Sequence, residues 1–300
     1  IDIPNSRKQH KNPIVRIGGL AISGGFIIAL TISFLIIKFL GLQNLELNYI
    51  FTLIFSIYSF FLIGIADDIY QLSPLFRLAL QIIITSIGFN HGIALETLDI
   101  RFLHLNIEKL ELNTIISYLI TIFWLTGIPN AINWMDGLDG LAAGVAAISF
   151  FIFFIINLHS GFILLGVISL VIFGCLCGFL RFNFFPAKVV MGDGGSNFIG
   201  SLLAYLSILP LTNFYLEMQN YNGSFKFFYP LIILLIPIVD MLYVVLSRLI
   251  KGKSPFYPDR NHFHHRLLKR GFSHKQTVVF ILILHLSLCF TLPISLLFFT

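Results

Sequence analysis

The chain has little charge and little cysteine. Only 11% of its 300 residues are charged, against about 25% in an ordinary soluble domain, while 57% are hydrophobic and the mean hydropathy is +0.91. These proportions exclude a water-soluble globular core and predict a polytopic membrane protein. The three cysteines, Cys175, Cys177 and Cys289, all fall within apolar stretches, which excludes a disulfide framework and argues against a zinc site.

Long apolar runs recur along the whole sequence. A membrane-spanning helix needs roughly 20 apolar residues, and nine stretches meet this requirement: 17–37, 49–66, 75–95, 114–132, 137–156, 161–180, 197–216, 227–247 and 277–299. We therefore predict an all-α fold with about nine transmembrane helices in a single domain, residues 1–300. Weak alternation of apolar and polar residues over 97–112 predicts a small extracytoplasmic β-hairpin.

Lys and Arg gather in alternate connecting segments. Cytoplasmic loops of membrane proteins are enriched in these residues. If the N-terminal segment is cytoplasmic, 15 of the 19 basic residues lie on that side, in the loops 1–16, 67–74, 130–137, 181–196 and 248–276 or at their edges. Such a basic surface could also attract anionic lipid head groups, and charge alone does not separate that role from setting the topology.

Four polar clusters fall in these loops, and the first is a pair of carboxylates. Asp67 and Asp68 close the second predicted span, at the negative end of a helix dipole, where carboxylates are unfavourable. One interpretation is a solvated helix exit. The other is coordination of a metal-bound phosphate, because Mg²⁺ prefers carboxylate oxygens and usually keeps water and substrate phosphates as ligands.

The second cluster has two amides and two carboxylates. Asn130 and Asn133 are three residues apart, as are Asp136 and Asp139, so a helical backbone would place each pair on one face. These residues are candidates for a polar substrate-binding wall. Alternatively, Asp136 caps the fifth span, although a cap accounts for only one of the four side chains.

Asp193 lies in a glycine-bearing turn before the seventh predicted span. The amides of this turn and the helix N-terminus could face a phosphate while the carboxylate holds a cation. The alternative is that Asp193 or Ser196 is an ordinary N-cap.

The fourth cluster combines histidine and arginine within seven residues: Arg260, His262, His264, His265 and Arg266. Imidazole and guanidinium groups suit a diphosphate. Zinc is a weaker interpretation, because cysteine is absent nearby and the other clusters offer oxygen ligands.

A single acidic residue, Asp240, falls deep in the eighth predicted span. A carboxylate there is costly unless it faces the bundle interior or a wet cavity. An interhelical hydrogen bond and a catalytic role are equally compatible with this position.

Five motifs occur in an order that resembles the polyprenyl-phosphate N-acetylhexosamine-1-phosphate transferases, glycosyltransferase family 4. The superfamily includes bacterial undecaprenyl-phosphate GlcNAc-1-phosphate transferases and phospho-MurNAc-pentapeptide transferases, and the His-Phe-His-His arrangement looks more like the first branch. Members usually begin with one more span before the basic loop. The motifs are Pro13-Ile-Val-Arg16-Ile-Gly-Gly19, Gly64-Ile-Ala-Asp67-Asp68, Asn130-Ala-Ile-Asn133-Trp-Met-Asp136-Gly-Leu-Asp139-Gly, Met191-Gly-Asp193-Gly-Gly-Ser196 and Asp259-Arg-Asn-His262-Phe-His264-His265-Arg266.

The resemblance implies an Mg²⁺-dependent transfer of N-acetylhexosamine-1-phosphate, most simply GlcNAc-1-phosphate, from a UDP-sugar to polyprenyl (undecaprenyl) phosphate, with release of UMP. By similarity, Asp193 would ligate Mg²⁺, for which Mn²⁺ could substitute, and Asn133 would be a second metal contact. Asp67 and Asp68 would position the lipid phosphate or assist its deprotonation. The remaining assignments are His262, His264 and His265 as catalytic and Asn130, Asp136, Asp139 (near uracil), Arg260 and Arg266 as substrate-binding.

The same resemblance implies the bacterial plasma membrane as location, with the active site facing the cytoplasm. The expected partners are a UDP-N-acetylhexosamine, polyprenyl phosphate and membrane lipid, without nucleic acid, and Gly- and Ser-containing spans permit a homodimer. Within the class, the alternative is transfer of phospho-MurNAc-pentapeptide or another amino sugar. From other classes, the alternatives are a transporter with Asp240 on an ion path and a catalytically silent membrane scaffold.

Overall fold

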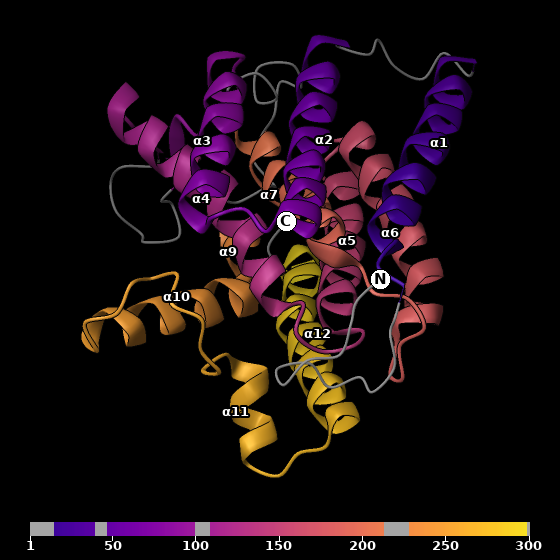
Figure 1. The fold of residues 1–300 in the computed structure, drawn as a ribbon. Helices are drawn as coiled ribbons and strands as arrows, with labels where there is room; N and C mark the ends of the chain where they lie inside the picture. The colour runs from indigo at the N-terminus through magenta and orange to yellow at the C-terminus, as the bar shows by residue number, and fades with distance from the viewer. Residues whose placement is uncertain (1–14, 40–46, 100–108, 213–227, 299–300) are drawn as a thin grey trace.

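The computed structural model describes residues 15–39, 47–99, 109–212 and 228–298, and most of them are helical (Figure 1). Of the predicted loop 1–16, only Val15 and Arg16 lie within this described part. The long helices run side by side as a bundle, which confirms the all-α polytopic membrane fold. The small hairpin is also confirmed. Strand β1 (Thr97–Asp99) pairs antiparallel with β2 (Lys109–Glu111), with Thr97 opposite Glu111.

Seven helices within the described ranges are long and apolar enough to cross a membrane. They are α1 (Gly18–Phe39), α2 (Leu47–Tyr70), α4 (Thr114–Met135), α5 (Leu141–His159), α6 (Ile163–Asn183), α7 (Gly192–Ile208) with the turn that continues it to Leu211, and α12 (His274–Phe298). Helix α3 (Pro74–Asn90) is apolar but shorter. The 3₁₀ turn η2 (Leu209–Leu211) follows α7, and the short helix α11 (Phe263–Lys269) precedes α12. The total of nine spans therefore stays a prediction.

The eighth predicted span, 227–247, is not one continuous helix. It breaks at Leu234 into α9 (Phe228–Ile233) and α10 (Leu235–Ile250). Pro237 has no N–H to offer the carbonyl of Ile233, and its ring crowds the preceding turn, so the break falls where a proline disrupts an α-helix. Helix α10 then runs crosswise to the long helices and extends beyond the bundle (Figure 1).

Helix α7 forms the centre of the bundle. Every residue from Gly194 to Ile208 is buried, and α1, α2, α4 and α5 all pack against it. Two glycines allow this close approach. A Cβ on Gly19 of α1 would lie 2.7 Å from Gly195 Cα, and one on Gly64 of α2 would lie 2.6 Å from Gly194 Cα. Both glycines belong to the motifs noted in the sequence.

The segment before α7 is held by the N-terminal segment. Val15 and Val189 form a parallel β-bridge, and Gly18 N donates to Val190 O over 3.1 Å. Helix α7 begins at Gly192 rather than near residue 197, so Asp193 lies in its first turn and not in a preceding loop. The motifs around residues 16, 68 and 193 are thereby brought to one end of the bundle.

Candidate functional site

Asp193 is the centre of the first group of polar side chains. Asn133, at the end of α4, donates from Nδ2 to Asp193 Oδ1 over 2.9 Å and to Ser196 Oγ over 2.9 Å. Asn133 and Asp193, which are expected to share a metal ion, are therefore neighbours, although they are 60 residues apart in sequence and belong to different helices.

Asp68 caps the N-terminus of α7. Its Oδ1 accepts the amide of Asp193 over 3.1 Å, and its Oδ2 accepts the amide of Gly194 over 3.2 Å. Arg16 Nη1 lies 2.7 Å from the same Oδ1. Free amides and the positive end of the helix dipole stabilise a carboxylate here. The amides of Asp193 and Gly194 are therefore taken by the carboxylate of α2, and the phosphate at this helix N-terminus stays a prediction.

Asp67 points in a different direction from its neighbour. It forms an ion pair with Arg77 of α3, and the two side chains are only 8% and 14% exposed. Arg77 is the single charged residue of the third predicted span, and sequence reasoning did not assign it a role. Arg77 compensates the negative charge of Asp67 at the C-terminal end of α2, and the Asp67 side chain is not solvated.

Three side-chain amides form a chain of hydrogen bonds that ends at the backbone of Asp193. Asn130 Nδ2 donates to Gln81 Oε1 over 2.7 Å, and Gln81 Nε2 donates to Asn197 Oδ1 over 3.1 Å. Asn197 Nδ2 then donates to the backbone oxygen of Asp193 over 2.8 Å. Gln81 and Asn197 were missed in the sequence, where the only signal is an amide inside an apolar run.

Asp136 and Asp139 do not share a helix face, because residues 136–140 form a turn. Asp136 is the C-cap of α4, and the N-cap of α5 is Gly140 at φ +78°, so Asp136 does not cap the fifth span. Asp139 Oδ2 accepts the amide of Ala187 over 3.0 Å and so fixes the loop between α6 and α7. Burial, followed by the charge of Asp193, raises the pKa of Asp136 to about 7.

Asp193 and Asn133 could hold a hard divalent cation only with further ligands from water or substrate. Among the described residues, no three His, Cys, Asp or Glu side chains form a metal-binding group. Asp193 and the Asn133 amide nevertheless supply oxygen ligands. A cation would also offset the charge of Asp193, which adds to burial in raising the pKa of Asp136. The residues fit Mg²⁺ that keeps water and substrate phosphates as further ligands, rather than a cage made of protein alone.

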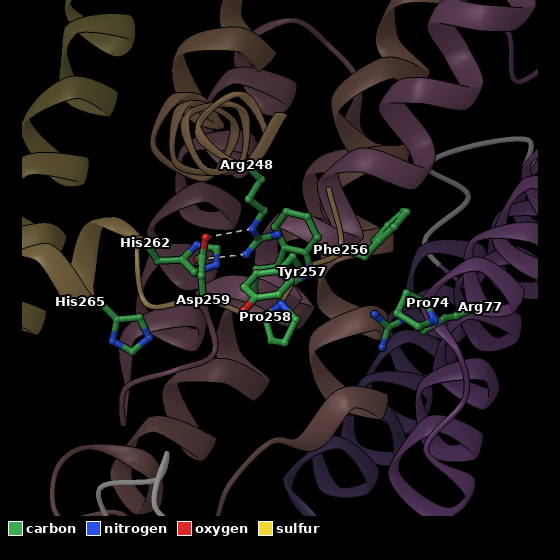
Figure 2. Close-up of a pocket in the computed structure, with 10 residues that line it drawn as sticks. Pro74, Arg77, Arg248, Phe256, Tyr257, Pro258, Asp259, His262 and His265 are labelled. Atoms are coloured by element: carbon green, nitrogen blue, oxygen red, sulfur yellow. Dashed lines mark hydrogen bonds and ion pairs between the residues drawn. The ribbon is translucent and has the colours of Figure 1, made fainter. Parts of the chain in front are cut away.

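A cavity of about 300 Å³ lies between α3, α4, α10 and the segment leading into α11 (Figure 2). It is connected to the residues above through Arg77, the partner of Asp67, and Trp134, which follows Asn133 in sequence. Its lining is cationic and aromatic, and includes Arg77, Trp134, Arg248, Tyr257, His262 and His265. Arg77 lies on one side of it and the histidines on the other.

Arg248 fixes the loop that forms one side of the cavity. Its Nε and Nη2 each donate to the Asp259 carboxylate over 3.1 Å, and its Nη1 donates to the carbonyl of Pro255. Its guanidinium lies 5.2 Å from the centroid of the Trp134 ring. Although burial opposes ionisation, hydrogen bonds from Arg248 and Asn261 lower the pKa of Asp259. Trp134, Asp259 and Asn261 belong to motifs noted in the sequence, whereas Arg248 and Pro255 do not.

The three histidines differ in their surroundings. His262 and His265 line the cavity, whereas Nε2 of His264 lies against Gly137. His262 and His264 are both buried. Burial, followed by the neighbouring His265 and His262, holds the pKa of His264 well below its ordinary value, so its imidazole is neutral. Burial, followed by His262, also lowers the pKa of His265.

The two arginines of the cluster are not among the residues that line this cavity. Arg260 is exposed, and its carbonyl accepts Lys269 Nζ over 3.1 Å. Arg266 stacks on Tyr243 of α10, with its guanidinium carbon 4.0 Å from the ring centroid. Asp240, in α10, is paired with His262, so it forms the interhelical hydrogen bond that its buried position requires.

Comparison with known proteins agrees with this geometry. The sequence model of glycosyl transferase family 4 matches residues 49–210. The chain belongs to this family. It is 33% identical over 281 residues to a probable undecaprenyl-phosphate N-acetylglucosaminyl 1-phosphate transferase of Bacillus subtilis (strain 168), covering 94% of this chain and 73% of the relative.

Two further relatives match a similar share of this chain. The decaprenyl-phosphate N-acetylglucosaminephosphotransferase of Mycobacterium leprae (strain TN) is 33% identical over 297 residues, which cover 93% of this chain and 72% of the relative. The undecaprenyl-phosphate alpha-N-acetylglucosaminyl 1-phosphate transferase of Salmonella typhi is 29% identical over 292 residues, with coverage of 94% and 72%. The family resemblance expected from the five motifs is confirmed.

Proposed function

We propose that this chain transfers GlcNAc-1-phosphate from UDP-GlcNAc to a polyprenyl phosphate, releasing UMP. The names of its relatives support the sugar phosphate and the polyprenyl phosphate acceptor. The observation that carries the proposal in the structure is the Asp193–Asn133 pair together with a cavity lined by Arg77, His262 and His265. Trp134, which follows Asn133 in α4, also lines this cavity. Carboxylate and amide oxygens can hold a cation there, and the cationic side chains can bind phosphate oxygens.

The reaction forms one bond and breaks one. An oxygen of the lipid phosphate attacks the sugar-side phosphorus of UDP-GlcNAc, and the bond from that phosphorus to the oxygen of UMP breaks. A phosphate monoester has a second pKa of about 6 and is mostly dianionic at neutral pH. The acceptor therefore needs little help from a general base, and the protein contributes mainly positioning and charge neutralisation.

The residues then have distinct tasks. Asp193 and Asn133 would hold Mg²⁺, which supplies positive charge to the diphosphate when bound. Asp68 and Arg16 fix the first turn of α7, and with it the Asp193 carboxylate. Asp67 acts on the acceptor phosphate indirectly, because it holds the guanidinium of Arg77 at the cavity wall.

The acceptor is a lipid, so the reaction has to take place where the bilayer meets water. We place this face on the cytoplasmic side of a bacterial plasma membrane, since 15 of the 19 basic residues fall on the same side under the predicted topology. Cysteine labelling from outside intact cells tests this orientation. A single cysteine introduced at Lys253 should be inaccessible, whereas one at Lys109 should react.

The activity is tested with the purified chain in detergent. Undecaprenyl phosphate and Mg²⁺ are incubated with UDP-GlcNAc, UDP-GalNAc or UDP-MurNAc-pentapeptide, and both UMP and the sugar lipid are quantified. We expect product from UDP-GlcNAc, loss of activity with a chelator, recovery with Mg²⁺ or Mn²⁺, and no product from the Asp193→Asn variant. Product from a different donor alone would correct the sugar. No product from any donor with folded protein would reject the transferase proposal.

A further inference from the structure

Asp240 is a buried carboxylate with both oxygens in use. It lies in α10, is 5% exposed, and faces the start of α11. Its Oδ2 is 2.9 Å from His262 Nδ1, and its Oδ1 accepts the amide of Phe263 over 2.6 Å. One side chain thus joins two helices and fixes both the backbone and the ring at the beginning of α11.

This contact determines which ring nitrogen of His262 is free. An ionised carboxylate only accepts hydrogen bonds, so Nδ1 must carry the hydrogen. Nε2 is then the nitrogen left for another partner. His262 lines the cavity together with Trp134 and residues 256–259. Figure 2 shows its ring beside Asp259. Since Nδ1 is held by Asp240, Nε2 is the ring nitrogen that we expect a ligand in the cavity to contact.

Neighbouring rings restrict the movement of His262. The rings of Trp134 and His262 meet edge to face, with their centroids 5.9 Å apart. The ring of His264 is stacked on that of His262, with the centroids 5.7 Å apart and the planes at 10° to each other. These contacts limit ring tilt but do not select a tautomer, because neither is a hydrogen bond to Nδ1. The choice of tautomer is therefore made by Asp240.

We propose that Asp240 is a positioning residue for the transfer reaction, holding His262 so that Nε2 is presented to the phosphates of a substrate in the cavity. The proposal rests on the proposed function for the identity of that substrate. When a phosphate oxygen accepts from Nε2, the ring donates from both nitrogens and carries a positive charge, which the buried carboxylate neutralises. Asp240 itself does not touch the substrate.

Two substitutions of His262 separate the two ring nitrogens. In His262→Asn the amide nitrogen takes the place of Nδ1 and can still donate to Asp240, but nothing reaches the position of Nε2. In His262→Gln the amide reaches the position of Nε2 without the link to Asp240. If Nε2 makes the essential contact, His262→Gln should keep more activity than His262→Asn.

The role of Asp240 is tested with a double-mutant cycle. Removal of a side chain that orients an active residue typically costs about 10- to 100-fold, and we expect a fall in kcat of that size for Asp240→Asn. In the His262→Gln background the same substitution should lower kcat by less than about 2-fold, since the group through which it acts is gone. Equal falls in both backgrounds would overturn the proposal.

A matched control accounts for the loss of a helix cap. Ser273 caps α12, and its Oγ accepts the amide of Gln276 over 3.3 Å, outside the cavity. Ser273→Ala should reduce the thermal midpoint as a lost cap does while leaving kcat within about 2-fold. If Ser273→Ala lowers kcat as much as Asp240→Asn, the effect of Asp240 is one of helix capping and the proposal fails.

A measurement without turnover separates this inference from the proposed function. ¹⁵N spectra of the full chain labelled at histidine, assigned by comparison with His262→Gln, report which nitrogen carries the hydrogen. We expect Nδ1–H in the wild type and a changed tautomer population in Asp240→Asn. An unchanged tautomer would overturn the inference even if the enzyme is active. A wild type that turns over no donor would reject the function and leave this result interpretable.

Discussion

We expect the substitution Gly64→Ala to lower kcat strongly while the protein stays folded. Gly64 is where α2 contacts the first turn of α7. A Cβ at this position would meet the backbone oxygen of Asp193 and would lie 2.6 Å from both Asp193 C and Gly194 Cα. All three atoms belong to the backbone, so no side-chain rotation can relieve the clash.

The size of the effect follows from these distances. Carbon atoms in normal contact are about 3.5 Å apart or more, so the two helices have to separate by roughly 1 Å at this point. Displacement of a catalytic group by about 1 Å can cost about 100-fold in rate. Overpacking of this kind typically destabilises a fold by about 1–3 kcal/mol. We therefore expect a folded protein whose kcat is reduced about 100-fold.

The assay is UMP release by monodisperse protein, with the thermal midpoint measured on the same sample. Gly24→Ala and Gly174→Ala are matched controls, because a Cβ at either position meets nothing within 4 Å. Both should retain the activity of the wild type. A Gly64→Ala variant with unchanged kcat would show that the position of Asp193 does not depend on this contact, and the reasoning would fail.

Three further tests concern the Asp67–Arg77 pair, the Asp136 carboxyl and the contact of Gly137 with His264. Arg77→Gln leaves the buried Asp67 carboxylate unpaired and should cost about 3–5 kcal/mol in chemical denaturation, most of which Asp67→Asn should restore without restoring turnover. The pKa of Asp136 in the folded state, about 7, exceeds its ordinary value of 3.8, so its contribution to stability falls as pH rises between these values. Asp136→Asn should therefore gain stability over the wild type at pH 8 but not at pH 4, in the absence of Mg²⁺. Gly137→Ala brings a Cβ to 2.7 Å from His264 Nε2 and should lower the thermal midpoint, and His264→Asn should relieve this clash.

Each of these expectations has a clear contrary result. A double variant of Asp67 and Arg77 no more stable than the single one would mean that the pair does not compensate a buried charge. A stability difference for Asp136→Asn that does not vary with pH would mean that this carboxyl is ionised throughout. If the double variant Gly137→Ala/His264→Asn has the same thermal midpoint as Gly137→Ala alone, the contact with His264 is not the cause of the destabilisation.

Several features followed from the sequence because they depend on local composition. Apolar runs of the length of a bilayer fixed the membrane class, and the alternation over 97–112 gave the hairpin. The five motifs identified the family, and they also gave the neighbourhood of Asn133 and Asp193. The break at Leu234 follows from the local effect of Pro237, but the count of apolar residues alone concealed it.

Only the tertiary structure decided what adjacent side chains do. Asp67 and Asp68 are consecutive on a helix and so point about 100° apart. Which of them caps α7 and which pairs with Arg77 depends on the neighbouring helices. Likewise, the sequence shows three histidines, but only the structure shows that His262 and His265 line the cavity while His264 packs against Gly137.

The amides that hydrogen-bond to one another behind Asp193 could not be predicted from the sequence either. Gln81 and Asn197 are 116 residues apart, and each reads there as an isolated amide in an apolar run. The sequence determined which elements form and which residue types stand at their ends, because helix formation and membrane insertion depend on neighbouring residues. The tertiary structure decided the partner of each polar group, because a buried hydrogen bond depends on which helices meet in space.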